Sequence, residues 1–282
     1  MAMVLLWGSN WSVMKLGLLM APPFAFVSNR LLFSTAALAP AVALIRPKMP
    51  RNRGDIGNIL SYSIITAGSF TATNLGLASY SSGTGAVLTY TQPLIVFVLA
   101  LLFLQERASK RKIFGVAIGF SGVVILFMRN GEQIIPWSAA LLLLGAFLWA
   151  VGTIFYKLRL QNMNAALVNL VQAAITSLIL FYVSFLAEPD RPLWTWQYVC
   201  IVAYAGIGAS AIGMTIWLYL LKEERASSLS GSTLIVPVIA LLFGSWFMGE
   251  PLDERSVLGS ALVLTGVYLV NSKVGEDAGT SH

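Results

Sequence analysis

Two long segments of this chain match each other without a gap. The first is TYTQPLIVFVLALLFLQERASKRKIFGVAIGFSGVVILF (residues 89–127), and the second is TLIVPVIALLFGSWFMGEPLDERSVLGSALVLTGVYLVN (residues 233–271). Leu and Val matches count for little, because apolar segments resemble each other by chance. A constant shift of 144 residues also pairs the less common residue types: Pro93 with Pro237, Glu106 with Glu250, Gly115 with Gly259, and Gly122 with Gly266. This register predicts an internal repeat.

The composition of the whole chain indicates a membrane protein. Of its 282 residues, 57% are hydrophobic and only 11% are charged, and the mean hydropathy is +0.78. A soluble domain carries about 25% charged residues, so a water-facing surface cannot be built here. Apolar blocks of about 20 residues, the length that crosses a bilayer, follow one another. We therefore predict an all-α integral membrane protein with ten transmembrane helices, near residues 2–20, 23–45, 56–78, 82–104, 111–128, 136–157, 163–186, 195–221, 227–248 and 256–272.

The basic residues of the loops predict the orientation. With ten spans, 13 Lys and Arg residues fall in the loops or tail on one side, and only Arg129, Arg191 and Arg255 fall on the other. Loops rich in Lys and Arg stay in the cytoplasm. We expect a multi-pass protein with both termini cytoplasmic.

The repeat extends to the earlier spans and predicts two halves of opposite orientation. A shift of 142 matches Trp7 with Trp149 and Lys15 with Lys157, so spans one to five correspond to spans six to ten. Five is an odd number, so the second half must enter the membrane inverted. The connection after Glu106 is basic, whereas the one after Glu250 contains Asp253 and Glu254, as expected for loops on opposite sides. The sequence thus predicts two inverted five-helix repeats around a central cavity, residues 1–130 and 131–272, with a cytoplasmic tail at 273–282.

The sequence lacks the residues that several classes of function require. Cys200 is the single cysteine and His282 the single histidine. We therefore expect no metal site, no cofactor and no histidine-based catalysis, and we expect that the protein is not an enzyme. The net charge of +6 comes from short loops that orient the protein, so nucleic acid is not an expected partner. The expected partners are the lipid bilayer and a small-molecule substrate.

The residues also carry a family resemblance. LLWGSNWSVMKLGL (Leu5–Leu18) and the two Pro…Glu…Gly…Gly blocks resemble the EamA repeats of the drug/metabolite transporter superfamily. The chain looks closest to the bacterial YddG-type amino-acid and metabolite exporters. That resemblance implies export across the inner membrane through a cavity lined by spans one, three, four, six, eight and nine. The chain departs from the pattern at Trp149–Gly152, where the second WGSN-like element is degraded.

Aromatic and amide residues on these spans are the main candidates for substrate binding. Aromatic faces suit apolar groups, and amides and hydroxyls suit the polar end of an amino acid. Tyr90, Gln92 and Trp149 are preferred, since they lie near mid-span; the alternative is that such aromatics only pack or form interfacial belts. The full set of cavity candidates is Trp7, Asn10, Lys15, Tyr80, Tyr90, Gln92, Trp149, Tyr156, Tyr204 and Trp217.

Two cations lie inside spans, where a charge is costly unless it faces a cavity or a partner. Arg30 is a buried charge that either binds neighbouring polar groups or faces the cavity. Lys15 either attracts a substrate carboxylate or extends to the membrane surface. Glu106 and Glu250, at span ends, are expected to pair with charges or cap helices. Pro93 and Pro237 break backbone hydrogen bonds in two related helices, which predicts a hinge or a static bend in each. 

These features favour a transporter that exports small organic metabolites, in particular amino acids including aromatic ones, by alternating access. All Asp and Glu residues fall in loops, at span ends or in the tail, so we expect facilitated movement and not carboxylate-based proton coupling. The alternative is a sugar-phosphate or nucleotide-sugar exchanger, for which the spans offer only Lys15 and Arg30 as cations. A membrane enzyme or a scaffold that does not transport is less favoured.

Overall fold

The computed structural model describes residues 2–50, 52–106, 109–127, 135–249 and 252–271, and these ranges contain helices and no strand. Arg129, Glu250 and the tail at 273–282 lie outside them. We use the word rod for a helical run that corresponds to one predicted span, whether it is one helix or several in succession. Seven rods are single helices: α1 (Ala2–Leu18), α2 (Pro23–Ile45), α3 (Arg53–Leu77), α6 (Lys110–Phe127), α7 (Pro136–Arg159), α8 (Ala165–Ala187) and α13 (Glu254–Asn271). Three rods are interrupted: α4 (Ser82–Thr89) with α5 (Gln92–Phe103), α9 (Trp196–Ala203) with the π-helix η1 (Tyr204–Gly213) and α10 (Met214–Glu223), and α11 (Ala226–Ser232) with the 3₁₀ helix η2 (Thr233–Ile235) and α12 (Val236–Met248).

The all-α prediction is confirmed, and each predicted span coincides with one rod to within three residues at either end. Six rods are long and apolar enough, by length and composition, to cross a membrane: α2, α4 with α5, α7, α8, α9 through α10, and α11 through α12. Local chemistry sets the helix ends. Asn52, Ser81 and Asn164 accept backbone N–H bonds as N-caps, and α12 ends at Gly249, whose φ of 67° suits glycine.

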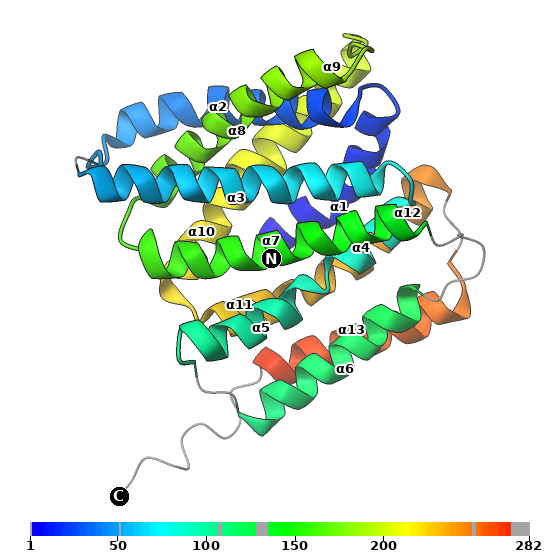
Figure 1. The fold of residues 1–282 in the computed structure, drawn as a ribbon. Coiled ribbons are helices and arrows are strands. Elements are labelled where there is room, and N and C mark those ends of the chain that lie inside the picture. Colours follow the sequence, from blue (N-terminus) through cyan, green and yellow to red (C-terminus); the bar gives the residue numbers. More distant parts are fainter. Residues whose placement is uncertain (1, 51, 107–108, 128–134, 250–251, 272–282) are drawn as a thin grey trace, which may run out of the picture.

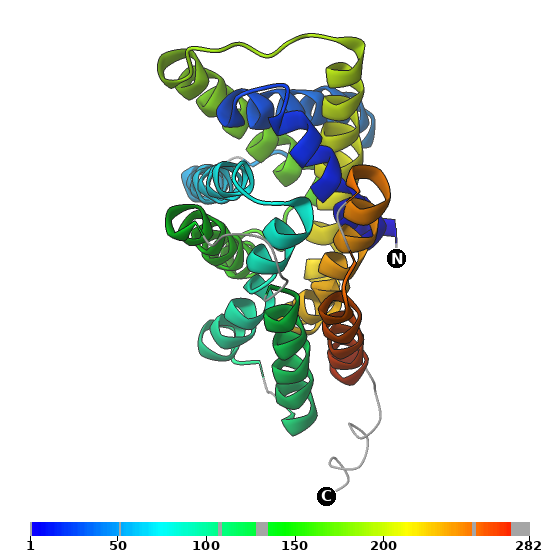
Figure 2. The same ribbon diagram turned by 90° about the vertical axis from the view of Figure 1, so that its right-hand side faces the viewer.

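The helices lie side by side, with α2, α8 and α9 at the top of Figure 1 and the pair α6 and α13 at the bottom. In Figure 2, α3 and α7 are seen nearly end-on. The closest helix pairs combine an early with a late part of the chain: α6 with α13, α3 with α7, α2 with α8, and α1 with α12. The two halves of the sequence are therefore packed together and do not form separate bodies.

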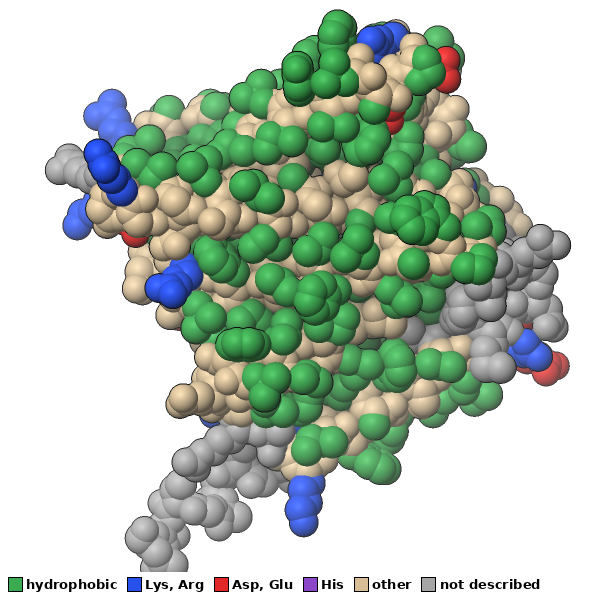
Figure 3. All heavy atoms as spheres, viewed as in Figure 1, with side chains coloured by type: hydrophobic (Ala, Val, Ile, Leu, Met, Phe, Trp, Pro, Cys, Tyr) green, Lys and Arg blue, Asp and Glu red, His purple; other side chains and the backbone are tan. Residues whose placement is uncertain are grey.

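The surface follows the pattern expected in a bilayer. Figure 3 shows hydrophobic side chains across the visible face and charged side chains at the ends of the helices. Large apolar side chains are strongly exposed along the rods, among them Ile64, Leu102, Leu178 and Trp246. Such a surface would drive association in water, whereas lipid tails solvate it.

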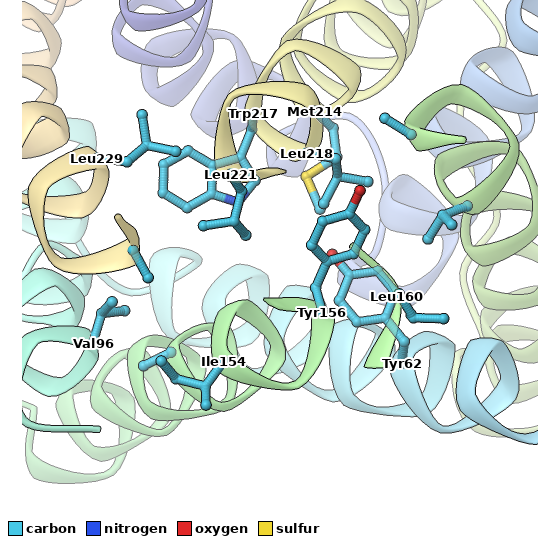
Figure 4. Close-up of a cluster of buried hydrophobic side chains, with 14 of the residues drawn as sticks. Tyr62, Val96, Ile154, Tyr156, Leu160, Met214, Trp217, Leu218, Leu221 and Leu229 are labelled. Atoms are coloured by element: carbon cyan, nitrogen blue, oxygen red, sulfur yellow. The ribbon is translucent and has the colours of Figure 1, made fainter. Parts of the chain in front are cut away.

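Two hydrophobic clusters lie toward opposite ends of the bundle. The Tyr156 cluster (Tyr62, Val96, Tyr156, Leu160, Met214, Trp217, Leu221 and their neighbours) comes from the first half of α3, from the later turns of α7, and from α5 and α10. Figure 4 shows Tyr156 beside Tyr62, whose ring centroids are 5.9 Å apart, with Trp217 and Leu221 above them. The Tyr90 cluster (Trp11, Met14, Phe26, Leu77, Tyr80, Tyr90, Tyr198, Val236 and their neighbours) comes largely from the last turns of α1 and α3 and the beginnings of α2 and α9.

The glycines of the matched segments form the contact between α6 and α13. A Cβ atom added to Gly266 would lie 2.5 Å from the carbonyl oxygen of Gly115 and 2.5 Å from the nitrogen of Gly119. One added to Gly122 would lie 2.6 Å from the carbonyl oxygen of Gly259. The two backbones touch at these points, as in other membrane helix pairs that small residues join.

We predict that Gly266→Ala forces α6 and α13 apart and lowers the free energy of unfolding by about 1–3 kcal/mol. The measurement is the thermal unfolding midpoint of the purified protein in detergent. Gly57→Ala in α3 is the matched control, since its Cβ would meet nothing within 4 Å. There alanine should stabilise the helix by about 0.5–1 kcal/mol. Equal midpoints for the two variants would contradict the backbone contact.

Candidate functional site

A cavity of about 90 Å³ lies inside the bundle, with walls from both halves of the sequence. It is smaller than the 300–1,000 Å³ typical of small-molecule sites, so it has room for only a few waters in this conformation, and a metabolite would require the helices to separate. The described lining residues are Trp7, Asn10, Trp11, Met14, Arg30, Ser69, Phe70, Thr73, Asn74, Thr89, Tyr90, Gln92, Trp149, Ala209, Ser210 and Met214.

One face of α1 forms a wall of this cavity. Trp7, Asn10, Trp11 and Met14 follow the i, i+3, i+4, i+7 spacing that places residues on one side of a helix. Lys15 is the next residue, and its Nζ donates instead to the carbonyl oxygens of the last turn of α3, at 3.2 Å and 3.0 Å. The structure therefore places the Lys15 ammonium on a helix end and outside the cavity lining.

Three tryptophans from different helices meet at the cavity. The ring of Trp7 lies 5.5 Å from that of Trp149 in an edge-to-face arrangement, and 5.5 Å from that of Trp217. Trp149 and Trp217 are 6.2 Å apart, and Phe70 of α3 lies 6.1 Å from Trp149 on its other side. Edge-to-face and tilted ring pairs of this kind hold an aromatic wall in place.

The cavity lining also contains a buried arginine that the π-helix η1 holds. Arg30 of α2 is 5% exposed, and its Nε and Nη2 donate to Oγ of Ser210 at 3.2 Å and 3.0 Å. The Ser210 hydroxyl donates in turn to the carbonyl of Ala205, five residues earlier in η1. Nδ2 of Asn169 donates to the carbonyls of Ser210 and Ala211. π-helical turns are rare and are frequent at functional sites.

Several residues of the cavity lining carry buried polar atoms without a partner. Within the described part of the chain, nine buried side-chain oxygen or nitrogen atoms have no hydrogen-bond partner, and five of them belong to cavity residues. They are Oδ1 of Asn10, Oδ1 of Asn74, Oγ1 of Thr89, Oε1 of Gln92 and Nε1 of Trp149. A buried polar atom without a partner costs free energy, so atoms of this kind mark a place where water or a ligand binds.

Comparison with known proteins agrees with this architecture. The sequence profile of the EamA-like transporter family matches residues 1–128 and again residues 136–272. The chain belongs to the EamA-like transporter family. It is 26% identical to the uncharacterized transporter YoaV of Bacillus subtilis, over 95% of this chain and 94% of that one. It is 28% identical to a probable amino-acid metabolite efflux pump of Escherichia coli, over 94% of this chain and 91% of that one. A solved crystal structure superposes with a TM-score of 0.79 at 18% identity, over 96% and 94% of the two chains, which supports the fold alone.

In this EamA-like transporter, six of the predicted residues lie together around the cavity: Trp7, Asn10, Arg30, Tyr90, Gln92 and Trp149. The other candidates lie elsewhere. Tyr204 shares a 2.5 Å hydrogen bond with Ser9 and is 36% exposed. The Tyr80 hydroxyl exchanges hydrogen bonds with the backbone of Ile135. Tyr156 belongs to the Tyr156 cluster, and Trp217 supports the cavity only through its contacts with Trp7 and Trp149.

The transporter has a second group of lining residues that the sequence analysis did not identify. Ser69, Phe70, Thr73 and Asn74 lie on one face of α3, at i, i+1, i+4 and i+5. A polar stripe at this spacing inside an apolar span is a signal that could have found them. Met14 and Trp11 continue the face that Trp7 and Asn10 begin. Ser210 and Ala209 could not be found in this way, because η1 does not have the spacing of an α-helix.

The two prolines lie just after interruptions in their rods. Pro93 is the second residue of α5, after the break that follows Thr89, and Pro237 is the second residue of α12, after η2. Proline has no N–H to continue the helix, which accounts for both breaks. Whether these breaks act as hinges stays a prediction. Glu106 accepts hydrogen bonds from the first backbone N–H groups of α11, at Ala226 and Ser227, which is the expected capping role.

We predict that Gln92→Met leaves the free energy of unfolding unchanged or raises it, since its Oε1 has no partner to lose. The same change should weaken substrate binding. Asn169→Leu is the contrasting variant, because it removes donors from two carbonyls of η1 and from Oγ1 of Thr215. It should lower the free energy of unfolding by about 1–3 kcal/mol. Thermal unfolding in detergent measures both, and a strongly destabilised Gln92→Met would contradict an unpartnered amide.

Proposed function

We propose that this transporter exports amino acids, including aromatic ones, and related small metabolites from the cytoplasm. The observation that carries the proposal is the cavity itself, in which aromatic walls from Trp7, Phe70 and Trp149 stand next to unpartnered amide oxygens. Aromatic faces bind apolar side chains, and amide oxygens bind an ammonium group. The relative named as a probable amino-acid metabolite efflux pump supports the same substrate class. This function requires no enzymatic chemistry.

Movement of the substrate is facilitated and not coupled to protons through a carboxylate. Arg30 is the single ionisable acid or base with a full charge among the described lining residues. Two buried or half-buried glutamates near helix ends are already bound: Glu106 caps α11, and Glu188 accepts the N–H groups of Phe24 and Ala25 at the beginning of α2.

Transport proceeds by alternating access between the two ends of the bundle. The Tyr156 cluster and the Tyr90 cluster lie toward opposite ends, and the cavity touches members of both, Met214 on one side and Tyr90 on the other. Opening one cluster while the other stays packed would expose the cavity to one side at a time. Pro93 and Pro237, next to breaks in two related rods, are the proposed hinges.

The two halves, residues 1–130 and 131–272, are proposed to be inverted repeats in the inner membrane, with both termini cytoplasmic. The double match of the family profile supports the division. So do Lys15 and Lys157, at equivalent positions of the two halves: Lys15 binds the end of α3, and Lys157 binds the end of α10 through the carbonyls of Leu221, Lys222 and Glu224. The uneven distribution of basic loop residues supports the orientation.

A sugar-phosphate or nucleotide-sugar exchanger is the alternative on the same fold. A phosphate group carries up to two charges and is usually held by several cations. The described lining offers one, Arg30, because the ammonium of Lys15 lies on the end of α3. The observed charges therefore favour the amino acid.

We predict that the purified protein in proteoliposomes takes up labelled L-phenylalanine in a saturable manner, at the same initial rate with and without an imposed pH gradient. Trp149→Ala, which removes one aromatic wall, should reduce uptake at least about tenfold, given the 1–3 kcal/mol that a well-packed aromatic contact contributes. Uptake that depends on the gradient would contradict facilitation. Absence of uptake for aromatic and aliphatic amino acids alike would rule out the proposed substrates.

The proposed orientation of the protein in the membrane can be tested separately. In a Cys200→Ser background, a cysteine replacing Asp190, between α8 and α9, should react with a membrane-impermeant maleimide added to intact cells. A cysteine replacing Lys48, between α2 and α3, should react only after the membrane is opened. Both side chains are exposed, so accessibility within the protein is matched. The reverse pattern of labelling would place the termini outside.

A further inference from the structure

We propose that Arg30 is the anchor for a substrate carboxylate, so that the cavity selects molecules with a free carboxylate over their amides and amines. This inference rests on the proposed function and makes it more specific. It assigns one residue to one chemical group. The observations that carry it are the hydrogen bonds of the guanidinium, its lack of a described counter-ion, and the unpartnered polar atoms of other lining residues.

The hydrogen bonds of Arg30 leave one edge of the guanidinium available. Nε and Nη2 both donate to the single oxygen of Ser210, and no described residue accepts a hydrogen bond from Nη1. The ring of Phe70 lies against the face of the group, with its centroid 5.3 Å from Cζ. Because Nη2 carries two hydrogens, the edge formed by Nη1 and Nη2 can still bind both oxygens of a carboxylate in the forked geometry that arginine favours.

The charge of Arg30 has no acidic partner among the residues that the structure describes around it. Its hydrogen-bond acceptor there is a neutral hydroxyl, and no Asp or Glu lines the cavity. The side chain is nevertheless 5% exposed. A buried cation without a counter-ion is strongly disfavoured in a protein interior and more so inside a bilayer. Binding of an anion would relieve this cost, which gives a substrate carboxylate a large advantage over a neutral amide.

The rest of the cavity fits the other end of an amino acid. The amide of Asn74 is oriented by its donation to the carbonyl of Phe70 at 2.8 Å, which leaves Oδ1 without a partner. Asn10 is fixed similarly, with Nδ2 on the sulfur of Met14 and Oδ1 unpartnered. With Oε1 of Gln92, three residues of the lining carry unpartnered carbonyl-type acceptors, which would suit the three donors of an ammonium group once the substrate reaches them.

The same arrangement makes a neutral or purely cationic ligand a poor fit. A substrate amine without a carboxylate would place a second positive charge in a cavity that already contains Arg30, and like charges at close range repel. A zwitterion instead adds no net charge to the site. The selected class is therefore the α-amino acid with an apolar or aromatic side chain, followed by simple carboxylates that lack the ammonium.

The first test uses the wild-type protein. Binding to the full chain in detergent is followed by tryptophan fluorescence, since Trp7, Trp11 and Trp149 line the cavity. The probes are L-phenylalanine, 3-phenylpropionate, L-phenylalaninamide and phenethylamine. We expect L-phenylalanine to bind most tightly, 3-phenylpropionate to be next, and the two probes without a carboxylate to bind at least about tenfold more weakly. Equal affinity for L-phenylalanine and its amide would overturn the proposal, whatever the variants do.

The second test changes Arg30. Arg30→Gln should weaken binding of L-phenylalanine and 3-phenylpropionate about ten- to hundredfold, and it should leave the weak binding of phenylalaninamide unchanged or strengthen it, because the variant removes a like charge from the cavity. Arg30→Lys should restore part of the loss, because it keeps the charge and lacks the fork. Arg191→Gln is the matched control, since Arg191 is an exposed arginine that lies over the ring of Phe185 away from the cavity. A uniform loss for all four probes would indicate a general effect on the fold and overturn the specific anchor.

Uptake in proteoliposomes distinguishes the Arg30 anchor from the broader proposal that the protein exports amino acids. Transport of phenylalanine and phenethylamine at equal rates would leave the amino-acid function standing and overturn the Arg30 anchor. Carboxylate-selective, Arg30-dependent binding without any uptake would support the anchor and overturn export of amino acids. Tighter Arg30-dependent binding of glucose 6-phosphate than of L-phenylalanine would overturn the carboxylate assignment and favour the exchanger.

Discussion

Helix ends inside a bilayer have no water to satisfy them, and this constraint determines where the protein places its charges. The last carbonyls of α3 and α10 are bound by Lys15 and Lys157, and the first N–H groups of α11 and α2 are bound by Glu106 and Glu188. Each charge also matches the sign of the helix end that it binds, positive at a C-terminus and negative at an N-terminus. These four rod ends therefore leave fewer backbone groups unpaired.

Because these charged side chains bind helix ends, few charges remain to line the cavity. Lys15, Lys157, Glu106 and Glu188 are engaged at helix ends, and Arg30 is the one fully charged residue among the described residues that line the cavity. Its position depends on η1, because the π-helix presents Ser210 toward Arg30 while Asn169 satisfies the carbonyls that the irregular turn frees. A charged site is thus built on a backbone irregularity that lies inside the protein, where a bilayer tolerates it.

The sequence predicted the rods well because its signals are local. Apolar length, prolines and loop charges fix each span within a few residues, and the face of α1 follows from helical spacing alone. The side-chain partners depend on distant segments and were harder to predict. Lys15 lies beside a cavity-lining face, yet it binds carbonyls more than 60 residues away in the sequence, at Leu77 and Ala78. Tyr204 and Ser210 lie in η1, where helical spacing misplaces side chains. Arg30 faces the cavity because α2 packs against η1, a contact that no local pattern encodes.

The polar atoms of the cavity indicate what a transporter gains from imperfect packing. Asn10, Asn74 and Gln92 are buried with oxygens that have no partner in the described chain, which makes this conformation less stable than a fully satisfied core. These atoms are shielded from solvent in this conformation, and under the proposed alternating access one of the two clusters would open to expose them. A ligand that satisfies them stabilises whichever conformation encloses it, and a ligand that leaves them unpaired does not. Under alternating access, each transport cycle would pass through a conformation in which the substrate is enclosed. Only a substrate that pairs with these atoms would lower the free energy of that conformation, so substrate selection and the conformational change would depend on the same unpaired atoms.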